Sequence, residues 1–270
     1  MELDLLNLLV GVVVVSAFGV LSIMIRIVNI SGAIAGFFVG LFVFIFGGWK
    51  WFLIILTFHL IAGSSTKFRY QYKKSKGVAE ERLGARGWEN VLANGGIATM
   101  LSIIEGITPS QIFFIGFLGA VSTAFTDTLA TEIGVLYPHA PRLITNMKKV
   151  PTGTSGAISP FGELAVIGGA IVIGSLSCFL DLTNLNLQTI LLIALIGGFS
   201  GTTLDSVIGA TIQAMYKCQV CGKIVEKGLH CDTPTIHLKG IRLFNNNVVN
   251  LCSTAFGAIT AILTYLMLGL

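Results

Sequence analysis

The chain has 270 residues, of which 54% are hydrophobic and only 11% are charged, and its mean hydropathy is +0.85. Soluble domains carry about 25% charged residues, so a chain this poor in charge is not expected to fold in water. The net charge of +4 is too small to indicate a nucleic-acid partner. The composition therefore predicts a protein embedded in a bilayer.

Eight apolar segments follow one another along the chain, each a candidate for one membrane crossing. They run over residues 5–28, 31–47, 49–64, 88–107, 110–137, 157–180, 187–216 and 246–268. The second and third are short and joined at Gly47–Gly48, so we expect a tilted or partly re-entrant pair there. Because lipid cannot hydrogen-bond to the backbone, we predict an all-α, polytopic integral membrane helix bundle. It would form a single domain with about eight transmembrane helices.

Three longer loops at residues 65–87, 138–156 and 217–245 separate these segments and hold most of the positive charge. Together with Arg26 they contain all of the 17 lysines and arginines except Lys50. Since Lys and Arg are retained on the cytoplasmic side, the loops are predicted to be cytoplasmic and both termini external. We expect a prokaryotic cell membrane, and the sequence indicates no oligomeric state.

Four carboxylic acids lie inside predicted membrane segments: Asp127, Glu132, Glu163 and Asp205. Each costs roughly 2.5–3.5 kcal/mol there, so such residues are functional candidates. The predicted topology brings all four to the cytoplasmic half of the bundle. Five asparagines at the starts of two helices share that depth: Asn90, Asn94, Asn246, Asn247 and Asn250. The alternative is a set of separate interhelical hydrogen bonds.

Glycine, serine and threonine surround Asp127 and Asp205. Small side chains allow close helix approach, and hydroxyl groups add oxygen ligands. Two carboxylates on facing helices suit a hard cation such as Mg²⁺, which bridges to substrate phosphates. The alternative is ordinary packing of small residues, and both interpretations can hold together.

The loop at 148–156, Lys-Lys-Val-Pro-Thr-Gly-Thr-Ser-Gly, precedes a predicted helix. Backbone N–H groups and cations before a helix N-terminus suit an anionic phosphate. The spacing is not that of a Walker A motif. A simple flexible turn remains the alternative.

The third loop contains Cys218 and Cys221, followed by His230 and Cys231. Two cysteines two residues apart, with a second pair of soft ligands, predict a structural Zn²⁺ site. The alternatives are reduced thiols without a metal and a redox pair.

Three stretches, 126–134 (TDTLATEIG), 151–156 (PTGTSG) and 204–213 (LDSVIGATIQ), resemble the family that contains transmembrane protein 19 and the plant phytyl-phosphate kinase of vitamin E biosynthesis. The resemblance continues through 64–67, 91–96 and 246–250 and so covers most of the chain. More distantly, the chain is similar to CDP-diacylglycerol synthase and dolichol kinase, which use CTP and Mg²⁺.

The resemblance implies a kinase that moves a phosphoryl group from a nucleoside triphosphate, with CTP favoured, onto a membrane-embedded isoprenyl monophosphate. It implies Mg²⁺ at Asp127 and Asp205, with Glu132 as third ligand or water holder. The residues implied for the nucleotide phosphates are Lys148, Lys149, Gly153, Thr154, Ser155 and Gly156. Those implied for the acceptor phosphate are Lys67, Arg86, Asn90 and Asn94.

Two other functions stay open. A CTP-dependent cytidylyltransferase acting on a lipid phosphate would use similar residues. A cation-coupled transporter would also contain intramembrane acids and glycine-broken helices. Carriers hold ions near the middle of the membrane, however, whereas these acids are predicted near one side.

Overall fold

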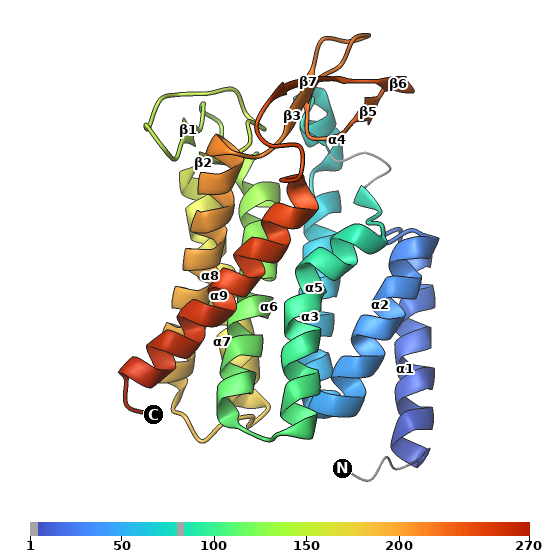
Figure 1. The fold of residues 1–270 in the computed structure, drawn as a ribbon, viewed down its shortest axis with the longest axis vertical. Coiled ribbons are helices and arrows are strands. Elements are labelled where there is room, and N and C mark those ends of the chain that lie inside the picture. Colours follow the sequence, from blue (N-terminus) through green and yellow to red (C-terminus); the bar gives the residue numbers. More distant parts are fainter. Residues whose placement is uncertain (1–4, 80–83) are drawn as a thin grey trace.

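The computed structural model describes residues 5–79 and 84–270 (Figure 1). Long helices stand side by side: α1 (Leu5–Met24), α2 (Ile30–Phe42), α3 (Gly48–Lys67), α5 (Trp88–Ile107), α6 (Gln111–Gly134), α7 (Pro160–Phe179), α8 (Leu187–Thr211) and α9 (Asn246–Met267). In the described chain, seven helical stretches are long and apolar enough to cross a membrane. The prediction of a polytopic helical bundle is confirmed. Arg82, one of the basic loop residues, lies outside the described residues.

The second of those stretches, Ile30–Lys67, is a hairpin of two helices. A π-helical turn, Val43–Gly47, follows α2, and at Gly48 the backbone takes a φ of 83° and a ψ of 171°. Glycine adopts this conformation without the clash that a Cβ would cause. Helices α2 and α3 then run in opposite directions (Figure 1), and Ile27, just before α2, packs against Gly63 near the end of α3. The described chain therefore passes through the bundle eight times.

The two ends of the bundle are built differently (Figure 1). One end, here the loop end, carries residues 68–79, 84–87, 135–159 and 212–245, including the short helix α4 (Tyr70–Ser75). The other, the turn end, carries Gly47–Gly48 and the short connections 108–110 and 180–186. Both ends of the described chain lie at the turn end.

Short antiparallel strands in the loops were not predicted. They are β1 (Arg142–Leu143), β2 (Ala157–Ile158), β3 (Met215–Lys217), β4 (Ile224–Val225), β5 (Leu229–His230), β6 (Thr233–Pro234) and β7 (Ile236–Lys239). Strands β1 and β2 pair, β5 and β6 pair, and β4, β3 and β7 form a three-stranded sheet in that order. The loop end is thus folded rather than a set of open connections.

Two predicted helices were too long. The segment 187–216 ends as a helix at Thr211, because Ala214 donates its N–H to Phe244 and Met215 begins β3. These apolar residues are buried by the third loop rather than by lipid. Likewise α1 ends at Met24, and Ile27 bonds to the first loop through its carbonyl oxygen. Hydropathy alone does not distinguish the two kinds of burial.

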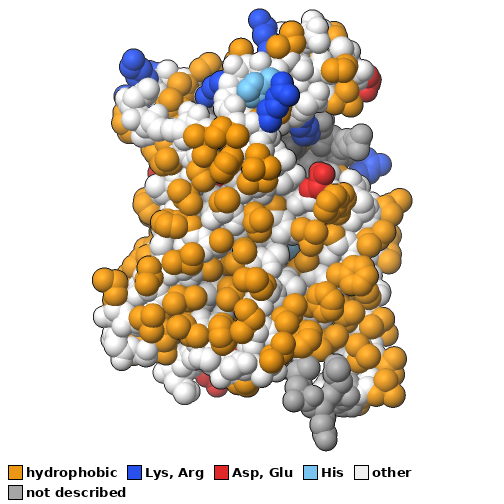
Figure 2. Space-filling model, viewed as in Figure 1, with side chains coloured by type: hydrophobic (Ala, Val, Ile, Leu, Met, Phe, Trp, Pro, Cys, Tyr) orange, Lys and Arg blue, Asp and Glu red, His pale blue; other side chains and the backbone are white. Residues whose placement is uncertain are grey.

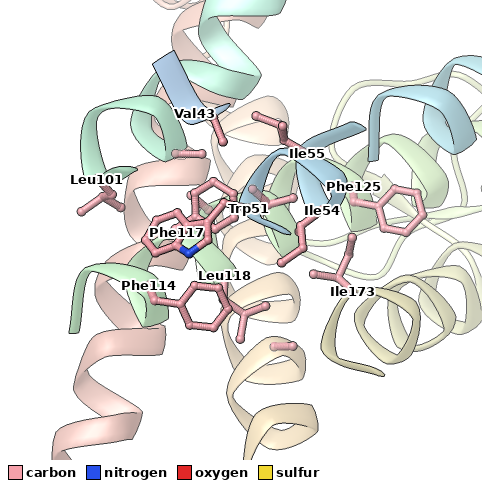
Figure 3. Packing of buried hydrophobic residues seen from close by; sticks show 14 of the residues in the cluster. Val43, Trp51, Ile54, Ile55, Leu101, Phe114, Phe117, Leu118, Phe125 and Ile173 are labelled. Carbon is pink, nitrogen blue, oxygen red and sulfur yellow. The ribbon is translucent and has the colours of Figure 1, made fainter. Parts of the chain in front are cut away.

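Helix α6 lies at the centre and packs against α3, α5, α7, α8 and α9. Figure 3 shows aromatic rings of the core among aliphatic side chains such as Ile54 and Leu118. The ring of Trp51 on α3 lies with its centroid 4.6 Å from that of Phe117 and 5.1 Å from that of Phe114, both on α6. Outside, hydrophobic side chains cover the helices, whereas Lys and Arg gather at the loop end (Figure 2). This is the surface expected of a bundle that spans a bilayer.

Candidate functional site

Two carboxylates lie on neighbouring helices in the loop-end half of the bundle. Asp127 on α6 and Asp205 on α8 lie close enough for their charges to interact. Their helices are joined directly beside them, since the Oγ1 atoms of Thr126 and Thr202 are 2.9 Å apart and Thr126 also donates to the carbonyl of Gly198 at 3.2 Å. The structure therefore brings together the two acids that were predicted to share a site.

The small residues around the acids serve close packing. A Cβ on Gly119 of α6 would overlap the carbonyl oxygen of Gly257 on α9, so only glycine permits this approach. The Thr123 hydroxyl donates to Gly119 within α6 and, at 3.0 Å, to Gly197 of α8. The Thr123 and Thr126 hydroxyls thus hold α6 to α8, as the packing interpretation requires.

Asp205 is held by two side chains of α9. The Ser253 hydroxyl donates to its Oδ2 at 3.2 Å. In the amide orientation that satisfies its neighbours, Asn250 donates to the same oxygen at 3.2 Å and accepts from Asn94 Nδ2 of α5 at 3.1 Å. Asn94 donates as well to the carbonyl of Asn90 at 2.9 Å. A continuous chain of hydrogen bonds therefore crosses from α5 through α9 to α8.

This chain of hydrogen bonds ends at a cationic side chain. Arg86, just before α5, donates to Asn90 Oδ1 at 3.3 Å, and its charge interacts with Asp127. We call the connected set the polar layer: Arg86, Asn90, Asn94, Asp127, Asp205, Asn250 and Ser253. Three of the four residues implied for an acceptor phosphate thus lie beside the acids. Ser253 was not predicted, although it lies almost one turn after Asn250 on the same helix face.

Glu132 has a partner that the sequence did not indicate. Its carboxylate pairs with Lys73 of α4, whose Nζ is 2.5 Å from Oε2. Lys73 is only 1% exposed and also donates to the carbonyls of Ser65 and Thr66 at the end of α3. The pair ties the first loop to α6 and α3. This role differs from the role of metal ligand or water holder that the family resemblance implies for Glu132.

Two further predicted residues lie at the loop end. Glu163, in the first turn of α7, lines a small pocket together with Thr202 and Ser206 of α8 and with Ile144 of the second loop. Lys67 ends α3, and its charge interacts with that of Arg26.

The loop at 148–156 lies between β1 and β2, and it does not open directly into a helix as predicted. Residues 157–159 intervene, and the N-terminus of α7 is already capped by the Ser159 hydroxyl. Instead, Gly156 packs against Ser206 and Ala210 of α8, and Ser155 donates to Gln213 at 3.0 Å. The loop therefore packs against the C-terminal end of α8. Its contacts start at Ser206, the residue that follows Asp205. Lys148 and Lys149 are exposed.

The three loops meet above the polar layer. Gly153 of the second loop packs against Val78 of the first, and Lys223 of the third approaches Gly77 of the first. Glu226, between β4 and β5, interacts by charge with both Asp127 and Asp205. No sequence pattern indicated Glu226, because its position depends on how the third loop folds.

That loop also gathers the predicted zinc ligands. One ligand atom from each of Cys218, Cys221, His230 and Cys231 lies within 4.8 Å of the others. In the described residues this is the one group of three or more Cys, His, Asp or Glu gathered so closely.

The family described as integral membrane protein DUF92 matches residues 13–258. Protein PGR of Arabidopsis thaliana is 31% identical over 92% of both chains. Protein VTE6, chloroplastic, of the same plant is 31% identical over 86% of this chain, which spans 64% of the length of VTE6. A membrane protein of Methanocaldococcus jannaschii is 30% identical over 98% of this chain and 99% of its own.

No solved structure matches this chain. The family match begins within α1, ends within α9 and includes every residue of the polar layer. The chain therefore belongs to the DUF92 family of integral membrane proteins.

Proposed function

We propose that the protein is a kinase that transfers a phosphoryl group from a nucleoside triphosphate, with CTP favoured, to a membrane-embedded isoprenyl monophosphate. The observation that carries the proposal is the polar layer, in which two carboxylates, an arginine and amides are connected in the loop-end half of the bundle. The resemblance to the phytyl-phosphate kinase family and the identity to VTE6 support this choice of reaction.

The acids fit a magnesium site. Asp205 uses Oδ2 for Asn250 and Ser253, which leaves Oδ1 of Asp205 and the carboxylate of Asp127 for a hard cation that prefers oxygen ligands. When bound there, Mg²⁺ would neutralise phosphate charge. The amide chain from Asn94 through Asn250 fixes the direction in which Asp205 points. Arg86 supplies a second positive charge beside Asp127.

In the proposed reaction an oxygen of the lipid phosphate attacks the terminal phosphorus of the nucleotide. A new O–P bond forms, the bond to the bridging oxygen breaks, and the nucleoside diphosphate leaves with that electron pair. Since the acceptor is already ionised, the step needs positioning and charge neutralisation rather than a strong base. Arg86, Asn90, Asn94 and Lys67 would hold the acceptor phosphate.

The second loop is proposed to hold the nucleotide. Gly153, Thr154, Ser155 and Gly156 would offer N–H and hydroxyl groups, and Lys148 and Lys149 would contribute charge. The excess of Lys and Arg at the loop end would place it in the cytoplasm, where nucleotides are found, with both termini outside.

The test is to incubate the purified chain with Mg²⁺, CTP and phytyl or geranylgeranyl phosphate and to follow the products by ³¹P NMR. A kinase gives CDP and a lipid diphosphate. Pyrophosphate with a CDP-lipid would identify a cytidylyltransferase instead, and unchanged substrates together with ion-coupled uptake in vesicles would identify a transporter. Parallel reactions with ATP and GTP establish which nucleotide is used, and Asp205→Asn is the matched inactive control.

A further inference from the structure

We propose that Cys218, Cys221, His230 and Cys231 bind one zinc ion, which fixes the third loop over the polar layer. The site is separate from the magnesium ligands and does not depend on the kinase activity proposed above.

The distances suit a tetrahedral ion. Zinc bonds of about 2.3 Å to sulfur and about 2.0 Å to nitrogen set neighbouring ligand atoms roughly 3.5–3.8 Å apart. His230 Nδ1 lies 3.5 Å from Cys221 Sγ and 3.3 Å from Cys231 Sγ. All four ligand atoms lie within 4.8 Å of one another, so a small contraction completes the tetrahedron.

The backbone around the first two cysteines is arranged as metal-bound thiolates require. The N–H groups of Val220 and Cys221 point at Cys218 Sγ, at 3.4 and 3.5 Å. Such hydrogen bonds to a ligand sulfur orient it and stabilise its negative charge. The cysteines are not joined by disulfides, so their sulfurs are available to a metal.

Three sulfurs and one nitrogen favour zinc over magnesium or calcium, which prefer oxygen. Four protein ligands also leave no open position for a substrate, so the site is structural rather than catalytic. A zinc ion would stabilise the fold of this loop, whose strands β4, β5 and β6 contain only two residues each.

Zinc binding would also affect Glu226, which lies between Cys221 and His230 in the sequence. Cys221 precedes it by five residues and His230 follows it by four. Its charge reaches both Asp127 and Asp205. Zinc bound by Cys221 and His230 would restrain the segment that carries Glu226, whereas a metal-free loop would allow that segment more movement.

The experiment measures zinc by mass spectrometry in the full chain, purified without a metal-affinity tag. We expect about one zinc per chain in the natural protein, none in Cys218→Ser/Cys221→Ser, and one in the matched control Cys178→Ser/Cys252→Ser, whose cysteines lie on α7 and α9. Iron in place of zinc, zinc that persists in the cluster variant, or zinc lost from the control would overturn the proposal.

A second measurement needs no variant. Chelator-stripped natural protein is given Co²⁺, and a tetrahedral thiolate spectrum is expected in proportion to the chain. Stripping should also speed cleavage by a lysine-specific protease at Lys223 and Lys227 several-fold, with little change at Lys148. A chain that contains no zinc and gives no such spectrum disproves the site, and equal cleavage with and without metal disproves its role in stabilising the loop.

Discussion

The loop end and the turn end use the same kind of helices for different purposes. At the turn end, Trp51, Phe114 and Phe117 pack ring against ring, and the carboxylate of Glu105 caps a neighbouring backbone N–H at 2.8 Å. At the loop end, hydrogen bonds among carboxylates, amides and hydroxyl groups join the helices instead. Ionisable groups inside a membrane bundle cost stability, so their presence there indicates that function retains them. We therefore expect changes at the turn end to affect stability alone and changes in the polar layer to affect the proposed activity.

The largest effect is expected from Asp127→Asn and Asp205→Asn. Each change keeps the shape of the side chain but removes a metal-binding charge, so turnover in the ³¹P assay should fall by at least about 100-fold. Glu105→Gln is the turn-end control and should leave turnover unchanged. Near-normal activity of either aspartate variant at limiting Mg²⁺ would exclude the metal assignment.

The next largest effect is expected at the buried Lys73–Glu132 pair. Lys73→Met leaves the Glu132 carboxylate without its partner, which should cost about 3–5 kcal/mol of stability. The measurement is thermal unfolding in detergent, compared with the double variant Lys73→Met/Glu132→Leu.

The double variant distinguishes the two roles of Glu132. If the pair is structural, replacing both groups should restore most of the stability and most of the turnover. If Glu132 instead binds the metal, stability would return but turnover would not.

At the turn end, Phe117→Ala should lower stability by about 3 kcal/mol, because it opens a cavity against Trp51. Turnover of the folded fraction at low temperature should stay within about twofold of the natural protein. A large loss of turnover in folded protein would show that the two ends are coupled and would break the comparison.

A smaller effect is expected from Asn250→Ala, which removes one hydrogen bond to Asp205. A hydrogen bond to a charged group contributes about 1.5–3 kcal/mol, so turnover should fall by roughly 10- to 150-fold. Asn247→Ala, on the same turn of α9, is the control. If both variants behave alike, the amide chain does not orient the carboxylate.

The smallest effect is expected from Lys148→Ala/Lys149→Ala. Both side chains are exposed, and exposed charges contribute only about 0.2–1 kcal/mol each. The KM for nucleotide should rise a few-fold while the KM for lipid stays constant. Equal changes in both constants would favour a role for these lysines as membrane-orienting charges only.

The bundle could be predicted from the sequence because each crossing is a long apolar run and the charges are so unevenly distributed. The hairpin at Gly48 and the strands of the loops could not. The reversal of direction depends on the φ and ψ of one glycine. A strand of two residues is too short to show the alternation of apolar and polar residues from which strands are predicted. Ala214 and Met215 are apolar because they are buried, as in a membrane segment, although protein rather than lipid covers them.

Within the site, Asp127 and Asp205 were predictable because an acid in an apolar segment is conspicuous. The Lys73–Glu132 pair joins residues 59 positions apart, and one member looked like an ordinary loop lysine. The interaction of Glu226 with the two aspartates could not be predicted for a similar reason, because it depends on the fold of the third loop. Local sequence patterns indicate which charged side chains are energetically unfavourable in a membrane segment. Tertiary contacts determine which partners stabilise them.

The hydrogen bonds from Asn250 and Ser253 to Asp205 also have a consequence for biosynthesis. Both donors belong to α9, which leaves the ribosome after α5 and α8. Until it inserts, Asp205 lacks two donors and Asn94 lacks one acceptor, so the nascent bundle holds polar groups that lipid cannot satisfy. We expect such an intermediate to stay near the insertion machinery and to be a preferred target of membrane proteases. Completion of the site and escape from quality control would then be a single event.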